Sequence, residues 1–147
     1  MSTSTPHFTH QEFQDAHADA KAGLNHAEIH YTLNNQNHSF TTAGVSGGFS
    51  QTLISEGSGV ALGWKYPGGL QLGQNHFSFT QLLSAVFYAS PFDTYAEVVE
   101  GALDVQVHIT GEGDEEVAEI TGTITGAVFS NGTDQVVVNG EFKQFFP

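Results

Sequence analysis

Residues 103–142 decide the fold, and they read LDVQVHIT, GEGDEE, VAEITGTITGAVF, SNGTD and QVVVNGEF in order. In the first run apolar residues occupy every second position, and even spacings recur in the third and fifth runs. Since successive side chains of a strand point to opposite faces, each run predicts a strand with one apolar and one polar face. The connecting runs are short and rich in Gly, Asn and Asp, which favours tight hairpins. This stretch therefore predicts a three-stranded antiparallel meander.

The remainder of the chain predicts further short strands and one helix. Strand-like runs lie near residues 29–33, 38–42, 49–54, 60–66, 70–72 and 77–80, while residues 82–88 fit either a helix or a strand. Thr9 and Glu12 form a capping-box pattern, and Gly23 stands where a helix would end, which predicts a helix over residues 7–23. Together these patterns predict an all-β protein, an antiparallel β-sandwich or barrel of about eight or nine strands with one short N-terminal helix.

The domain organisation follows from the absence of an interior linker in the sequence. Residues 1–6 are rich in Ser and Thr and predict a flexible N-terminal tether. A chain of 147 residues is about the size of one domain. We therefore expect a single β-sandwich domain over residues 7–147.

The charge balance excludes several classes of partner. The chain has 16 acidic residues against three basic ones, all lysine, and a formal net charge of −13. Nucleic-acid phosphates need several cations on one face, so we expect no nucleic-acid partner.

No apolar run approaches the roughly 20 residues that span a bilayer, so we expect no membrane insertion. A polar, net-negative surface is typical of secreted modules, so we expect an extracellular or cell-surface location, although the start of the chain shows no signal-peptide pattern.

The C-terminal stretch resembles small secreted bacterial domains of the lipoprotein type, whose function is uncharacterised. Three segments carry the resemblance: Gly101-Ala102-Leu103, Ile120-Thr121-Gly122-Thr123 and Val136-Val137-Val138-Asn139-Gly140-Glu141-Phe142. It covers about a third of the chain and implies a β-sandwich without catalytic residues to transfer. The chain departs from that pattern because it has no cysteine for a lipid anchor.

Two groups of residues are candidates for metal binding. His26, Glu28 and His30 alternate along one expected strand and therefore project to the same side, a spacing that suits Zn²⁺ or Cu²⁺. Asp114 and Glu116 lie in the acidic, Gly-containing run 111–116, where carboxylate oxygens suit Ca²⁺. The alternative for both groups is a set of solvated polar side chains, and we expect no obligatory cofactor.

Aromatic residues are the stronger functional candidates. Trp64, Tyr66, Tyr88 and Tyr95 are predicted to bind a ligand if they lie on an exposed sheet face, the alternative being an aromatic core. Phe145 and Phe146 are predicted to promote assembly, with the chain end adding as a strand to a neighbouring subunit.

These patterns favour a non-enzymatic structural or adhesion module of the cell surface. Its expected partner is another protein or a second copy of itself, with self-assembly through edge strands. The alternative is a module that binds a carbohydrate or a small ligand on an aromatic face, with Ca²⁺ as an aid. No catalytic motif is recognisable, so we expect no enzyme, and an unrecognised hydrolase is the third alternative.

Overall fold

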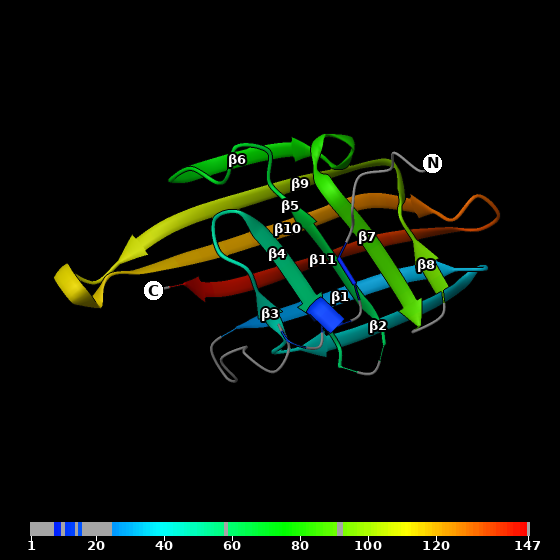
Figure 1. The fold of residues 1–147 in the computed structure, drawn as a ribbon, viewed down its shortest axis with the longest axis horizontal. Helices are drawn as coiled ribbons and strands as arrows, with labels where there is room; N and C mark the ends of the chain where they lie inside the picture. The colour runs from blue at the N-terminus through cyan, green and yellow to red at the C-terminus, as the bar shows by residue number, and fades with distance from the viewer. Residues whose placement is uncertain are drawn as a thin grey trace.

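The chain folds into two antiparallel sheets packed face to face, as predicted for a β-sandwich (Figure 1). The computed structural model describes residues 8–9, 11–13, 15, 25–57, 59–90 and 93–146. The larger sheet has the order β2-β1-β11-β10-β9-β6, with bounds β1 His26–Leu33, β2 Gln36–Thr42, β6 Gly73–Ser78, β9 Glu97–Thr110, β10 Val117–Ser130 and β11 Gln135–Phe146. The smaller sheet has the order β3-β4-β5-β7-β8, with bounds β3 Val45–Ser46, β4 Gln51–Ser55, β5 Ala61–Lys65, β7 Leu83–Ser90 and β8 Asp93–Tyr95.

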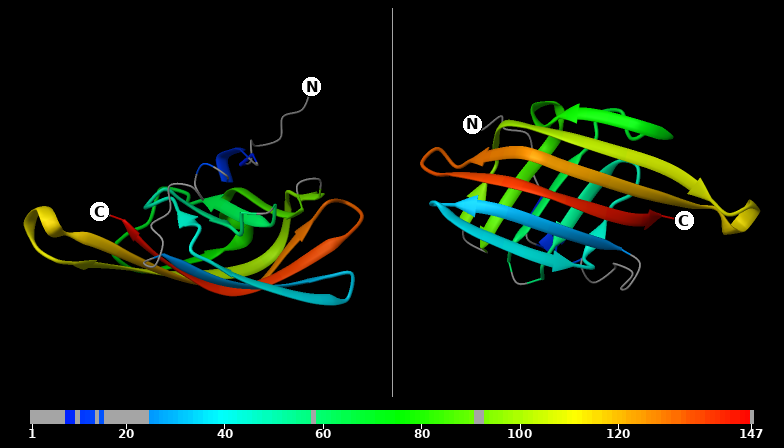
Figure 2. Two further views of the ribbon diagram at one scale, coloured as in Figure 1. Left: turned by 90° about the horizontal axis from the view of Figure 1, so that it is seen from below. Right: turned by 180° about the vertical axis from the view of Figure 1, so that it is seen from behind.

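The predicted meander forms the centre of the six-stranded sheet. Strands β9, β10 and β11 are antiparallel neighbours, with Ile120 opposite both Val107 and Gln144. Along β9, Val105 and Val107 are buried while the intervening Gln106 is exposed. The alternation read from the sequence is therefore confirmed. These long strands curve around the smaller sheet (Figure 2).

The strand count differs from the prediction. Eleven strands occur among the described residues, against about eight or nine expected. Two of the additional strands, β3 and β8, have only two and three residues. Residues 70–72 form no strand, and the end of the run 77–80 enters the 3₁₀ helix η1 (Phe79–Gln81). The ambiguous run 82–88 is a strand, since it supplies most of β7.

The capping box of the N-terminal helix forms as the sequence predicts, but Phe8 and Thr9 are not helical, so the helix starts later than residue 7. The Glu12 N–H donates to Thr9 Oγ1 at 3.2 Å, and the Thr9 N–H donates to Glu12 Oε1 at 3.1 Å, so the capping box is formed. Residues 11–13 and 15 are helical, while the predicted end at Gly23 lies outside the described residues, as does the expected tether 1–6.

The helical segment covers the smaller sheet on the face that points away from β1, β9, β10 and β11 (Figure 2). Phe13 is 1% exposed and belongs to a second apolar cluster with Phe8, Leu53, Ala61, Val86 and Tyr88. The smaller sheet is therefore buried on both faces, whereas the larger sheet has one face in water.

Candidate functional site

The water-exposed face of the six-stranded sheet carries two parallel rows of polar side chains. Directly opposed residues of antiparallel strands place their side chains side by side on the same face. One set, named row A, crosses five strands in register: His26, Lys143, Thr121, Gln106 and Gln74. The neighbouring set, named row B, lies two residues along each strand: Glu28, Glu141, Thr123, Asp104 and His76.

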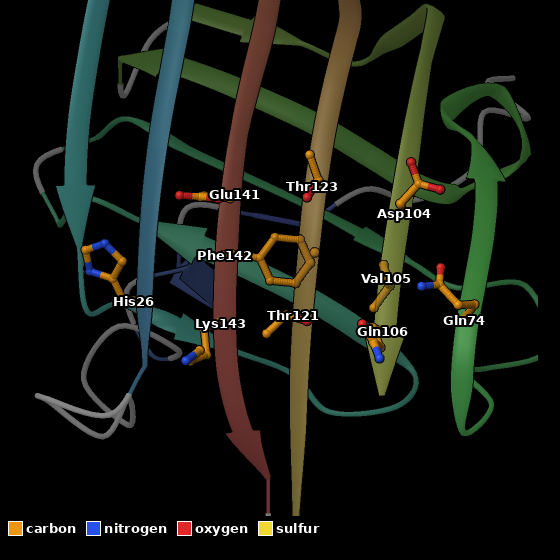
Figure 3. A pocket seen from close by; sticks show the side chains of 11 residues that line it. His26, Gln74, Asp104, Val105, Gln106, Thr121, Thr123, Glu141, Phe142 and Lys143 are labelled. Atoms are coloured by element: carbon orange, nitrogen blue, oxygen red, sulfur yellow. The ribbon is translucent and has the colours of Figure 1, made fainter. Parts of the chain in front are cut away.

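An open trough of about 360 Å³ lies between these rows, and we name it the sheet-face trough. All of row A lines it, together with Glu141, Thr123 and Asp104 of row B. Strand geometry separates the rows by about 7 Å and gives a row across five strands a length of about 19 Å. Figure 3 shows these side chains on successive strands, from His26 at one end to Gln74 at the other. The trough is therefore long and shallow, a shape that suits a chain molecule lying across the strands.

The floor of the trough is held up by the aromatic core. Between the rows lie Val105, Gly122 and Phe142, whose side-chain positions face the interior. The Phe142 ring lies directly beneath Gly122, in the space that a side chain at position 122 would need. The ring in turn meets Trp64 edge to face, with centroids 5.8 Å apart. Packing of the core thus fixes the backbone of the strands that carry row A and row B.

The two rows differ in charge. Glu28 and Glu141 of row B stand directly opposite each other, an arrangement that destabilises a sheet because like charges repel. At the other end of row B, His76 Nδ1 lies 2.7 Å from Asp104 Oδ1 and positions that carboxylate. Lys143 of row A lies 3.5 Å (Nζ to Oε1) from Glu119. Row B therefore offers mainly hydrogen-bond acceptors, while row A offers two amides, one hydroxyl, one imidazole and one ammonium group.

The aromatic residues predicted to bind a ligand lie in the interior instead. Trp64, Tyr66, Tyr88 and Tyr95 are 0%, 4%, 4% and 3% exposed, so the prediction of an exposed aromatic face is wrong. Trp64, Tyr66 and Tyr95 belong to the core between the sheets, while the Tyr88 hydroxyl donates to the Phe8 carbonyl oxygen at 2.6 Å. The first three face the other sheet, and Tyr88 lies beneath the N-terminal segment that covers the opposite face of the smaller sheet. An alternating pattern within a strand does not predict that the N-terminal segment covers the outer face of this sheet.

Burial of Tyr66 makes stability sensitive to high pH. Burial raises the pKa of Tyr66 to about 12, from 10 in the unfolded chain, and the hydrogen bond to Thr52 Oγ1 at 2.6 Å only partly offsets this. The folded state thus favours the protonated phenol. Its contribution to stability is complete below pH 10 and is lost as the pH rises to about 12. We expect the unfolding free energy to fall by up to about 1.4 kcal/mol per pH unit in that window.

Urea denaturation at several pH values between 10 and 12 measures this slope. In Tyr66→Phe the slope is expected to be shallower, with a residual fall because burial also raises the pKa of Tyr31, Tyr88 and Tyr95. A Tyr66→Phe/Thr52→Val double variant removes both hydrogen-bonding partners and separates the pH effect from the lost bond. Equal slopes in wild type and Tyr66→Phe would contradict the assignment.

Phe145 and Phe146 belong to β11 and occupy their own sheet. They pair with Glu119 and Ala118 of β10. The Phe146 ring meets Phe49 edge to face at 5.7 Å and is 38% exposed. Phe145 and Phe146 therefore pair within their own subunit. They are not free to add as a strand to a neighbouring subunit, in contrast to the predicted role of this segment.

The predicted metal ligands do not converge. His26, Glu28 and His30 project from the same face of β1, but the two histidines are four residues, or about 13 Å, apart along the strand. Zn²⁺ needs ligand atoms within about 2 Å, so one ion cannot be held by all three. Asp114 and Glu116 are exposed at the β9–β10 hairpin, beside the 3₁₀ helix η2 (Gly113–Glu115). In the described ranges, no three His, Cys, Asp or Glu side chains are placed to hold a metal ion.

Sequence reasoning identified only His26 among the residues that line the trough. The polar positions of the strands were recognisable, because the alternation assigns them to the wet face. Their grouping into rows depends on the register between strands far apart in the sequence, such as His26 opposite Lys143. No local signal carries that register.

Within the described residues, no helix has the length and apolarity to cross a membrane.

Comparisons with known proteins identify no relative of this chain. No protein-family model, no curated protein and no solved structure matches the chain, so the resemblance to secreted lipoprotein-type domains stays a prediction.

Proposed function

We propose that this protein is a non-enzymatic binding module of the adhesion type, which holds a neutral oligosaccharide in the sheet-face trough. The observation that carries the proposal is the alignment of row A and row B across five strands, with an open space of about 360 Å³ between them. An extracellular or cell-surface setting agrees with the polar, acidic composition.

The chemistry of the lining residues favours a polyhydroxylated ligand. Gln74, Gln106, Thr121 and Thr123 both donate and accept hydrogen bonds, as sugar hydroxyls do. The neighbouring carboxylates of Glu28 and Glu141 repel each other, and hydroxyl donors placed between them relieve that repulsion. An anionic polysaccharide is disfavoured, because the chain carries a net charge of −13.

A glycan array probed with the labelled full-length chain tests the ligand class, and calorimetry on the best neutral oligosaccharide then gives its dissociation constant. Calorimetry is preferable to intrinsic fluorescence, because Trp64 is fully buried and does not contact the trough. The Gln106→Ala/Thr121→Ala double variant removes two hydrogen-bonding side chains from the centre of row A. We expect it to weaken binding roughly 10- to 100-fold, since each hydrogen bond contributes about 1 kcal/mol.

The matched control is Gln135→Ala/Thr125→Ala, which changes the same residue types on β11 and β10 at exposed positions outside the trough. This control should bind as the wild type does. An array on which neutral glycans give no signal contradicts the ligand class. Equal losses in the two double variants contradict the assignment of the trough.

A further inference from the structure

Strand β2 (Gln36–Thr42) is an edge of the six-stranded sheet that lacks the usual protection against strand addition. Natural edge strands are commonly blunted by charged residues, proline, bulges or very short length. β2 has seven residues, QNHSFTT, with no charged residue, proline or glycine. It also pairs with β1 without a register shift.

The other edge strands among the described residues are shorter than β2. β3 and β8 have two and three residues, and β8 begins with the charged Asp93. Along β6 the Asn75 side chain turns back onto the preceding loop: its Oδ1 accepts from the Gln71 N–H at 3.0 Å, and its Nδ2 donates to the Gln71 carbonyl at 2.8 Å. β2 is therefore the edge best suited to accept another strand.

The β1–β2 hairpin determines which backbone groups of β2 face outward. Asn34 and Asn35 have φ values of 53° and 64°, as a two-residue type I′ turn requires. Such a turn is closed by a hydrogen-bonded pair, here Leu33 and Gln36, and hydrogen-bonded pairs then alternate along the ladder. Every second residue from Gln36 thus bonds to β1. The N–H and C=O groups of Asn37, Ser39 and Thr41 point to the free edge.

Ser39 is the middle one of the three outward-pointing residues, and we infer that two copies of the chain pair β2 to β2 around a twofold axis at this residue. In antiparallel pairing centred there, Ser39 meets Ser39 of the second copy and Asn37 meets Thr41. On the opposite face His38 meets Phe40, so these two rings, which both contact Tyr31 within one chain, also meet across the axis. The central positions carry no like charges that would oppose the pairing.

This arrangement makes the two six-stranded sheets continuous and places both wet faces on the same side, because directly opposed residues share a face. The two sheet-face troughs would then point in one direction, which allows two-point attachment to a repetitive surface. The dimer does not depend on the trough having a ligand. Repulsion between two acidic chains is screened by salt, so association should strengthen as salt concentration rises.

Sedimentation velocity over a concentration series tests the dimer in the full chain. The wild type should rise from 15.7 kDa toward twice that mass, and more completely at high salt. Ser39→Pro removes the central outward N–H, and Ser39→Lys places two like charges in contact; both should remain monomeric. Thr125→Lys adds the same charge on the exposed face of β10, away from β2, and should dimerise as the wild type does. A wild type that stays monomeric, or Ser39 variants that dimerise, would overturn the inference.

Disulfide trapping tests the register. The chain has no cysteine, so a single introduced thiol can link only to its own position in a second copy. In the inferred dimer the two Ser39 Cα atoms form a hydrogen-bonded pair about 5.5 Å apart, within disulfide range. Ser39→Cys should therefore give a covalent dimer on mild oxidation, whereas Asn37→Cys, whose two copies lie about 13 Å apart, should not. Equal linking by both variants, or linking by neither, would overturn this register.

Discussion

Trp64→Ala is expected to lower the free energy of unfolding by about 3–5 kcal/mol, the usual loss when a large buried aromatic side chain is truncated. Trp64 is 0% exposed. Its ring meets Phe79 at 5.4 Å, Phe142 at 5.8 Å and Tyr66 at 6.5 Å between centroids, all in edge-to-face geometry. Domains of this size are stable by about 5–15 kcal/mol, so this loss brings the protein close to unfolding. The contact between Trp64 and Phe142, which supports the floor of the sheet-face trough, would also be lost.

Urea denaturation followed by far-UV circular dichroism measures the change, because Trp64 is the only tryptophan and its removal abolishes the fluorescence signal. Leu72→Ala is the control, since Leu72 is 67% exposed and its truncation should alter stability by less than about 0.5 kcal/mol. A loss below about 1 kcal/mol for Trp64→Ala would show that the ring does not lie in a closed core.

Gly101→Ala is expected to cost about 2–5 kcal/mol, because backbone strain and a backbone clash add together. Gly101 lies in β9 with φ +136°, a conformation that L-residues rarely adopt. A Cβ at this position would lie 2.5 Å from the Cα of Ala127 in β10. That contact occurs where the β9–β10 register shifts, between Thr125 and Val128. The irregularity bends the long strands around the smaller sheet, as β-bulges do (Figure 2).

The control for this substitution is Gly113→Ala in the β9–β10 connection. Gly113 has φ +60°, and nothing lies within 4 Å of the Cβ that alanine would add. The cost there should be about 1–2 kcal/mol, from the left-handed backbone conformation alone. Thermal and urea denaturation of both variants separate the cost of the backbone conformation from the cost of the clash with Ala127. If Gly101→Ala costs no more than Gly113→Ala, the close approach of β9 to β10 at Ala127 is not a constraint on the fold.

The fold was predictable where one face of a strand meets water. Leu103, Val105 and Val107 are buried, and Asp104 and Gln106 are exposed, as the two-residue period requires. The capping box of Thr9 and Glu12 was predictable for a similar reason, since both partners lie within one helical turn. In each case the physical cause is local in sequence.

The surroundings of the aromatic residues and the site were not predictable, because their causes are not local. In β5, Leu62 and Trp64 face the core between the sheets, and Ala61 is buried as well, since the N-terminal segment covers the face that would otherwise meet water. Likewise, row A joins His26 to Lys143 at the other end of the chain through the β1–β11 register. The polar face of a strand can be predicted from its sequence. Which polar residues lie side by side on the sheet depends on which strands pair and in what register.

The most direct test of the central claim, that the sheet-face trough is the binding surface, is an amide ¹H–¹⁵N chemical-shift titration with the neutral oligosaccharide that binds most tightly on the array. The account predicts that the largest shifts fall on Gln106, Thr121 and Lys143 of row A and on Asp104 and Thr123 of row B. Shifts that concentrate on the smaller sheet, or that spread without a maximum at the trough, would contradict it.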